Sequence, residues 1–186
     1  MIKNVVLKDK TVVSIQPING KEDAEKFQSF INTLIEEGTY LLLDKTITLE
    51  QEKQWLQEQI RLQKNGEQIY LKALVNGHLI GNCFAKTGFG RNKKNVNLGI
   101  AVAKKWRGKG LGHILIHELI KLSERKWHPK NIYLHVVSSN KKAYKLYESL
   151  GFHAVARLPQ WFEYKGRYYD EFIMVLNKKF YHKIKK

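Results

Sequence analysis

A short glycine-rich segment ahead of an apolar stretch constrains the fold of this chain more than any other feature. Residues 104–112 read KKWRGKGLG, with glycine at the alternate positions 108, 110 and 112. Glycine lets the backbone turn tightly, so successive N–H groups can face one ligand without side chains between them. Residues 113–123 then carry apolar side chains at helical spacing, and the unpaired N–H groups at the start of such a helix favour phosphate. The segment predicts a turn that holds phosphate or pyrophosphate, with Arg107 and Lys109 beside it.

The best-known phosphate motifs do not fit this segment. A Walker loop needs G-x-x-x-x-G-K-[ST], and the dinucleotide fingerprint needs G-x-G-x-x-G. The pattern that fits is R-x-x-G-x-G, formed by Arg107, Gly110 and Gly112. It resembles the acetyl-CoA pyrophosphate loop of the GNAT superfamily, the acyl-CoA-dependent N-acetyltransferases. A solvated basic loop ahead of an ordinary helix is the alternative interpretation.

A second block strengthens the resemblance. Residues 131–137, NIYLHVV, are rich in side chains that favour a strand. Residues 138–152 follow as SSNKKAYKLYESLGF, with helical spacing of apolar side chains and Gly151 at the expected C-terminal stop. This segment resembles the second GNAT signature, in which Asn140 precedes Tyr147 by seven residues and Gly-Phe closes the helix. It is similar in particular to the ribosomal-protein N-terminal alanine acetyltransferases.

The rest of the chain agrees with a mixed α/β (α+β) fold. The capping-box pair Thr48 and Gln51 begins the second of two early helices, and Asn76-Gly77 is a strong hairpin signal. Gly99 predicts a bulge or a close backbone approach. The resemblance covers roughly residues 1–178 and implies a twisted, mostly antiparallel central sheet flanked by helices on both faces and splayed at the acetyl-CoA site. The segments expected before and after the two blocks are two short strands within 1–18, helices at 22–37 and 48–63, and strands at 68–75, 78–87, 95–103, 154–158 and 168–176.

Length and composition predict one domain in a reducing compartment. The 186 residues suffice for a single domain with a full core, spanning 1–186 with a basic tail at 178–186. No apolar run approaches membrane-spanning length, and lysines interrupt the N-terminal segment where a signal peptide needs an apolar core. The single Cys83 rules out an internal disulfide and suits the cytoplasm. A lone cysteine in a strand is more often a small core residue than a nucleophile.

The net charge of +16 raises the question of polyanionic partners. Thirty-three basic residues stand against seventeen acidic ones, and such an excess attracts RNA or ribosomes. The lysines are spread over most elements, so we interpret the excess chiefly as surface character and leave a polyanion contact and a homodimer open. His113 and His117 have the i, i+4 spacing of metal ligands, but no third ligand is apparent and we expect no metal.

The resemblance assigns residues to acetyl-CoA. The strand before the loop would grip the pantetheine arm, the loop would hold the pyrophosphate, and the helix of the second block would complete the site. The residues with these assignments are Ile100, Ala101, Val102, Arg107, Gly108, Lys109, Gly110, Leu111, Gly112, Asn140, Tyr144 and Tyr147.

Acetyl transfer to an amine also needs an acid and a base. The thiolate of coenzyme A needs a proton, and Tyr147 stands where the family carries its tyrosine; packing of that helix on the sheet is the alternative role. The general base is open between two residues. His135 occupies the position of a glutamate in the alanine acetyltransferases, and a histidine titrates near ~6.5. Glu37, at the end of the first helix, is the other candidate, and a structural histidine inside the sheet is the alternative for His135.

A cationic acceptor needs carboxylates and aromatic faces in a chain crowded with lysine. The predicted acceptor residues are Glu36, Glu37, Tyr40, Trp161, Tyr164 and Tyr168. The sequence predicts direct transfer from acetyl-CoA to a primary amine, which is a protein N-terminus, a polyamine or a small molecule. The rival class is a non-catalytic module that binds CoA or ribosomal RNA.

Overall fold

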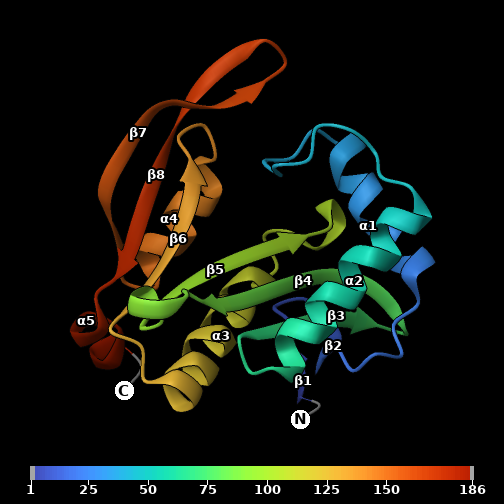
Figure 1. Ribbon diagram of the computed structural model, residues 1–186, viewed down its shortest axis with the longest axis horizontal. Helices are drawn as coiled ribbons and strands as arrows, with labels where there is room; N and C mark the ends of the chain where they lie inside the picture. The colour runs from blue at the N-terminus through green and yellow to red at the C-terminus, as the bar shows by residue number, and fades with distance from the viewer. Residues whose placement is uncertain (1–2, 185–186) are drawn as a thin grey trace. The chain divides into compact units, whose positions relative to one another are not determined.

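The computed structural model describes residues 3–184, which form eight strands, five α helices and two short 3₁₀ helices (Figure 1). The chain separates into two compact units. Unit 1 comprises the described residues up to 86 together with 100–119, and unit 2 comprises 87–99 together with the described residues from 120 onward. Strand β5 and helix α3 each contribute residues to both units. The expectation of one domain stays a prediction, and each unit is described by itself.

Unit 1 contains a strand meander with helices inserted after its second strand. The order along the sheet is β1-β2-β3-β4-β5, and β1 to β4 pair antiparallel with their neighbours. Asn76 and Gly77 join β3 and β4 with φ of 49° and 78°, which confirms the predicted tight hairpin. The elements are β1 (Lys3–Val6), β2 (Val12–Pro17), α1 (Ala24–Glu36), α2 (Leu49–Lys64), β3 (Gln68–Val75), β4 (His78–Thr87), β5 (Asn95–Val102), η2 (Lys104–Trp106) and α3 (Leu111–Trp127).

The core of unit 1 lies where α1 and α2 meet the sheet. Ile18, Phe27, Leu56 and Tyr70 form one buried cluster that joins these elements. Helix α2 begins with the predicted capping box, because Thr48 and Gln51 each accept a hydrogen bond from the other's backbone N–H. The predicted helices and strands of this unit are confirmed to within about two residues at each end, except that α3 ends four residues beyond the predicted end at position 123.

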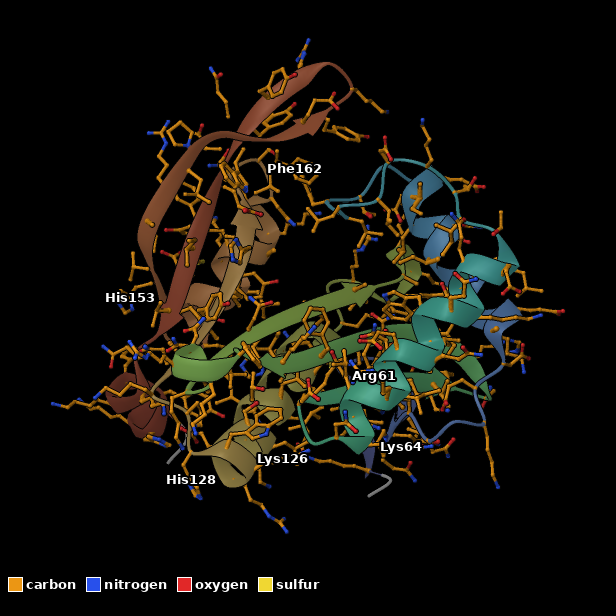
Figure 2. All side chains as sticks on the ribbon, in the orientation of Figure 1. Arg61, Lys64, Lys126, His128, His153 and Phe162 are labelled. Carbon is orange, nitrogen blue, oxygen red and sulfur yellow. The ribbon has the colours of Figure 1, made fainter. Side chains whose placement is uncertain are left out.

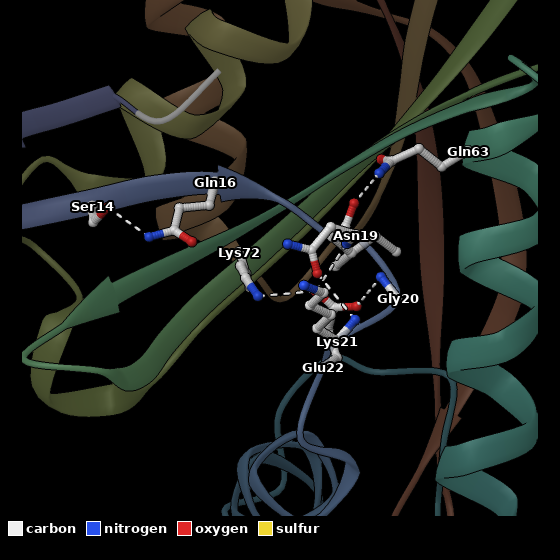
Figure 3. Close-up of polar contacts among 9 residues, drawn as sticks. Ser14, Gln16, Asn19, Gly20, Lys21, Glu22, Gln63 and Lys72 are labelled. Atoms are coloured by element: carbon white, nitrogen blue, oxygen red, sulfur yellow. Dashed lines mark hydrogen bonds and ion pairs between the residues drawn. The ribbon is translucent and has the colours of Figure 1, made fainter.

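The entry to α1 differs from the sequence expectation. Glu22 was predicted inside the helix, but Asp23 is the N-cap and Glu22 lies before it. The Glu22 carboxylate accepts hydrogen bonds from the backbone N–H groups of Asn19 and Gly20 and from Lys72 Nζ at 2.9 Å (Figure 3). Burial opposes ionisation of Glu22, but these donors outweigh it, and the pKa of Glu22 lies below its ordinary value. Glu22 therefore ties the linker between β2 and α1 to β3.

Unit 2 is built on the strand order β5-β6-β8-β7. Residues 95–98 of β5 pair in parallel with 131–134 of β6, and the β6–β8 and β7–β8 pairs are antiparallel. The predicted mixed fold with mostly antiparallel pairing is confirmed. The remaining elements are η1 (Gly90–Asn92), β6 (Asn131–Val137), α4 (Lys141–Ser149), β7 (Phe152–Tyr164), β8 (Arg167–Leu176) and α5 (Lys178–Ile184).

The C-terminal hairpin is longer than the sequence predicted. Strand β7 runs for 13 residues instead of the expected 154–158, with pairing irregularities at Ala154/Ala156 and Leu158/Phe162. Gln160 lies at a φ of 53°, and its N–H donates to Asp170 across the hairpin at 2.9 Å. The two irregularities interrupt the alternation of apolar and polar residues by which a strand is predicted from sequence. Phe162, just past the second one, is buried (Figure 2).

Residues 178–184, which the sequence predicted to be a basic tail, form helix α5. Tyr181 is 1% exposed, and its N–H donates to Asn177 O. Gly151, at a φ of 93°, ends α4 and also makes room for α5, because a Cβ there would lie 2.8 Å from Phe180 Cδ1. Helix α5 thus packs against Gly151, just past the end of α4. Residues 185 and 186 of the predicted tail lie outside the described residues. No helix in the described part of the chain is long and apolar enough to cross a membrane.

Candidate active site

The glycine-rich loop of unit 1 has the backbone conformation that the sequence predicted. Gly108 and Gly110 have φ of 76° and 93°, in the left-handed region that side chains disfavour. The N–H of Ile114 donates to Gly110 O at 3.1 Å, so the amides of residues 111–113 precede the first helical hydrogen bond of α3. Gly112 lies inside α3 and outside that region. Two left-handed glycines directly ahead of a long helix present N–H groups as an anion site requires.

The turn between β1 and β2 contacts this loop. Lys109 Nζ lies 2.8 Å from Asp9 Oδ2 and 4.8 Å from the centre of the Trp106 ring, and the Lys8 N–H donates to Lys109 O at 3.3 Å. The hydrogen bonds from Lys109 and then from Thr11 lower the pKa of Asp9 to about 2. The Lys109 side chain, expected on the cofactor, thus faces Asp9, a partner that the sequence analysis did not identify because the two are distant in the chain.

Arg107 connects the loop to α1 and to the end of β5. Its Nε–H donates to Val102 O at 2.8 Å, and its Nη1 and Nη2 reach the two carboxylate oxygens of Glu37, with Nη2 to Oε2 at 3.0 Å. A forked pair of this kind fixes geometry as well as charge. The sequence analysis assigned Arg107 to pyrophosphate and Glu37 to the amine, and the structure pairs these two side chains with each other.

The strand residues expected along the pantetheine arm, Ile100, Ala101 and Val102, are half-buried. Strand β4 approaches them closely, because a Cβ on Gly81 would lie 3.0 Å from Ala101 O. Glycine at position 81 therefore allows the contact between β4 and this part of β5. Gly81 was not singled out from the sequence, although an isolated glycine inside a strand can mark the close approach of another backbone.

Helix α4 of unit 2 carries the other proposed cofactor residues. Asn140 is its N-cap, with Oδ1 accepting from the Ala143 N–H at 3.2 Å. The Tyr144 ring lies edge-on to Phe172, with centroids 5.6 Å apart. Tyr147 is 7% exposed, and burial raises the pKa of its phenol to about 12. That side chain therefore stays a protonated donor across the neutral range.

His135 is a half-exposed side chain on β6, not a histidine enclosed within the sheet. Its Nδ1 lies 3.0 Å from Oε2 of Glu171 on β8, and their side chains are 39% and 10% exposed. No role was assigned to Glu171 from the sequence. The signal that could have found it is the antiparallel pairing of β6 with β8, which a single sequence does not reveal.

The predicted acceptor residues divide between the units. Glu36, Glu37 and Tyr40 belong to unit 1, and Glu36 and Tyr40 are exposed. Trp161, Tyr164 and Tyr168 belong to the hairpin of unit 2, where Trp161 and Tyr168 are 66% and 64% exposed. Their convergence on one acceptor stays a prediction.

Comparison with known proteins decides the family. Residues 32–152, which include the loop, β6 and α4, match the acetyltransferase (GNAT) family. The chain belongs to this family.

Two relatives of this GNAT chain show the range of acceptors. N-alpha-acetyltransferase 60 of Xenopus tropicalis is 31% identical over 98 residues, which cover 52% of this chain and 40% of that protein. Spermidine N(1)-acetyltransferase of Vibrio cholerae is 38% identical over 71 residues, which cover 38% of this chain and 41% of that protein. The chain thus spans about two fifths of the length of either relative.

Solved structures resemble the GNAT chain over most of its length. Ribosomal-protein-alanine N-acetyltransferase from Brucella melitensis is 25% identical with a TM-score of 0.74, over 87% of this chain and 97% of that one. The structure of yncA from Salmonella typhimurium with its cofactor acetyl-CoA is 23% identical with a TM-score of 0.76, over 88% of this chain and 92% of that one. The predicted resemblance to ribosomal-protein alanine acetyltransferases agrees with the first of these.

Other chemistry in this GNAT chain is constrained by burial. Cys83 is fully buried in β4, and burial raises the pKa of its thiol far above the ordinary value, so the reactive thiolate is disfavoured. His113 and His117, four residues apart on α3, stack with nearly parallel rings 6.5 Å apart. Among the described residues, no cluster of three or more histidine, cysteine or acidic side chains suits a metal ion.

Proposed function

We propose that this chain transfers the acetyl group of acetyl-CoA to a primary amine by direct attack in a ternary complex. The observation that carries the proposal is the pair of left-handed glycines, Gly108 and Gly110, directly ahead of α3 in a GNAT chain. Backbone N–H groups in that conformation bind phosphate without help from side chains. The proposal assigns roles to residues of both units and rests on contacts within each.

Acetyl-CoA would be held mainly by backbone. Amides of Gly108 to Gly112 would bind the pyrophosphate, and Ile100 to Val102 would pair with the pantetheine like an added strand. Tyr144 and Asn140 would contribute from α4. Because Lys109 is paired with Asp9 and Arg107 with Glu37, their side chains would act chiefly by fixing the loop and by their positive charge.

The reaction needs an uncharged amine, an electrophilic carbonyl and a proton for the leaving thiolate. The amine nitrogen attacks the thioester carbon, and an N–H of residues 98–102 would stabilise the charge that builds on the oxygen. The C–S bond then breaks, and the Tyr147 hydroxyl would protonate the departing sulfur. His135 would take the proton that the amine loses, directly or through a water. With Cys83 buried, no covalent acetyl-enzyme intermediate is needed.

The acid and the base belong to opposite faces of the β6–β8 ladder. The Tyr144 ring contacts Phe172, which places α4 over the face that carries Phe172. Glu171 is the next residue along β8, so it and its partner His135 occupy the other face. Tyr147 and His135 therefore do not contact each other directly.

The acceptor we propose is a cationic primary amine in a cytoplasmic setting. Relatives named for protein N-termini and for spermidine support this class without choosing within it. Carboxylates at Glu36 and Glu37 and aromatic faces at Tyr40, Trp161 and Tyr168 would attract such an amine. A homodimer is compatible with these assignments but is not required by them.

A non-catalytic module that binds polyanions is the second candidate function. The observation that favours it is the net charge of +16, with exposed basic side chains on α2 and at the end of α3. Arg61 and Lys64 are exposed on α2 of unit 1, and Lys126 and His128 are exposed at the end of α3 in unit 2, so each unit carries basic groups of its own (Figure 2). Such a surface would bring the chain to RNA or ribosomes.

Turnover with an amine panel separates the two functions. The purified chain is mixed with acetyl-CoA and, in turn, a peptide with an N-terminal alanine, spermidine and a small lysine analogue, and released CoA thiol is measured. An N-terminally blocked copy of the peptide is the control. We expect thiol release and an acetylated product only with a free amine. Acetyl-CoA binding by calorimetry without release on any amine would support the module instead.

A further inference from the structure

We propose that Glu171 is a positioning residue for the reaction, holding His135 in the tautomer that accepts the amine proton. The inference rests on the proposed function and adds a residue to it. Its basis is the 3.0 Å contact between His135 Nδ1 and Glu171 Oε2. A carboxylate oxygen only accepts hydrogen bonds, so Nδ1 carries the hydrogen and Nε2 is left as the acceptor.

The strand register makes the contact a built feature of unit 2. His135 pairs with Ile173, and Glu171 pairs with Val137, two positions along the same antiparallel ladder. Residues 135 and 171 are therefore diagonal neighbours on one face, a separation that long side chains bridge. The ladder between β6 and β8 fixes both backbones, so the pair needs no loop to assemble.

Glu171 is more buried than His135, as expected for a residue that positions a histidine which must itself reach the substrate. Glu171 is 8% exposed as a residue, whereas the His135 side chain is 39% exposed. Tyr133 lies edge-on to the His135 ring with centroids 5.9 Å apart and restricts its tilt. The imidazole is thus held from two sides while part of it stays accessible to a substrate or a water.

The proton balance of the step follows from these positions. As the nitrogen–carbon bond forms, the amine nitrogen loses one proton to Nε2 of His135, which becomes an imidazolium. The Glu171 carboxylate stabilises that cation through the Nδ1–H hydrogen bond. The imidazolium later returns its proton to solvent, and Tyr147 regains from solvent the proton it gave to sulfur. No oxidant or metal enters the balance.

The first test reads the tautomer and does not depend on turnover. We expect nitrogen NMR of the neutral wild-type imidazole to show hydrogen on Nδ1, and Glu171→Ala to shift the ring toward the Nε2–H form. Asp170→Asn, which removes the adjacent carboxylate on the same strand, is the matched control and should leave the His135 signals in place. A wild-type ring protonated mainly on Nε2 when neutral would overturn the proposal.

The second test is kinetic and uses a double variant. Glu171→Ala should lower kcat by about 10- to 100-fold, by analogy with the loss when the hydrogen-bond partner of a metal-bound histidine is removed, while acetyl-CoA affinity stays unchanged. Glu171→Gln keeps an acceptor for Nδ1–H and should lose less. In a His135→Ala background, Glu171→Ala should have no further effect on kcat.

The two tests separate this proposal from the proposed function. An equal loss on Glu171→Ala with and without His135 would mean that Glu171 acts on the fold alone, and the proposal would be wrong. If the wild-type chain acetylates no amine, the proposed function fails, and the NMR result still decides whether Glu171 sets the tautomer.

Discussion

The glycine-rich loop of unit 1 and the β6–β8 ladder of unit 2 show two different ways of building a site. In the loop, the groups that we propose bind a ligand are backbone amides of neighbouring residues, in a turn formed by the left-handed Gly108 and Gly110. On the ladder, the interacting groups are side chains 36 residues apart, His135 and Glu171, brought together by strand pairing. A site made of backbone amides is specified by one short sequence motif, whereas a side-chain pair depends on the register between two strands. The loop should therefore tolerate changes of side chain but not of backbone conformation. The ladder should tolerate small changes of backbone conformation but not the loss of either side chain.

Tyr147→Phe gives the largest effect that we expect. The substitution keeps the buried ring and its edge contact with Phe152 but removes the hydroxyl. Loss of a general acid costs about 10²–10⁴ in rate, and the lower end applies because a thiolate leaves well unaided. We expect kcat to fall by about 10², with acetyl-CoA affinity intact, in steady-state assays paired with calorimetry.

Tyr70→Phe is the control for this loss, since Tyr70 is an equally buried tyrosine in the core of unit 1. It should keep full turnover. If Tyr147→Phe also keeps full turnover when chemistry limits the rate, the proton comes from water and Tyr147 only packs α4.

Glu52→Gln tests a buried acid that belongs to neither site. Glu52 is 3% exposed in unit 1, and burial raises its pKa to about 7 from 4.5. The folded state thus binds this proton more tightly than the unfolded state, so stability falls as the pH rises from 4.5 to 7 and stays lower above that. Removing the charge should raise the free energy of unfolding by about 2 kcal/mol at pH 8 and by little at pH 4.5.

Denaturant unfolding at the two pH values measures this difference. Glu50→Gln, a change on the exposed side of the same helix, is the control and should show no such pH dependence. Equal effects of Glu52→Gln on the free energy of unfolding at both pH values would show that folding does not raise the pKa of Glu52.

Gly110→Val tests the backbone side of the comparison. A β-branched residue at a φ of 93° is strained, and the shift that relieves the strain would turn the loop amides away from a phosphate. Losing one charge-assisted hydrogen bond weakens binding by about 10-fold or more. We expect a loss of that size in acetyl-CoA affinity by calorimetry, in protein that remains folded.

Gly77→Val carries a matched strain, at a φ of 78° with open space around it, in the β3–β4 hairpin. It should destabilise the chain to a similar degree and leave acetyl-CoA affinity unchanged. Equal affinities for both variants would remove the pyrophosphate role from the loop.

Glu37→Gln gives the smallest effect that we expect. It tests the contact between Glu37, predicted to bind the amine, and Arg107, predicted to bind the cofactor. The amide keeps hydrogen-bonding atoms near Arg107 but loses the charge that would attract a cationic amine. We expect a rise of about 3- to 10-fold in KM for the amine, because a charge that is already paired with Arg107 contributes roughly 1 kcal/mol. Abolished turnover instead would make Glu37 the base, and a rise confined to KM for acetyl-CoA would mean that it acts through Arg107.

The sequence predicted the parts of this chain that local chemistry decides. The Thr48 cap, the Asn76-Gly77 hairpin and the strand–loop–helix order around Gly110 all follow from residues within a few positions of each other. The pairing of Arg107 with Glu37 joins residues 70 positions apart, and no spacing rule predicts it. The C-terminal hairpin was only partly predicted, because its irregularities around Leu158 break the period-two pattern.

Initial-rate kinetics with acetyl-CoA and the amine varied together test the central claim most directly. The claim is that the loop and the ladder serve one ternary complex, with buried Cys83 taking no part. We predict double-reciprocal lines that intersect, and an intact protein mass unchanged by acetyl-CoA alone. Parallel lines, together with a protein that gains one acetyl group before any amine is added, would contradict the account.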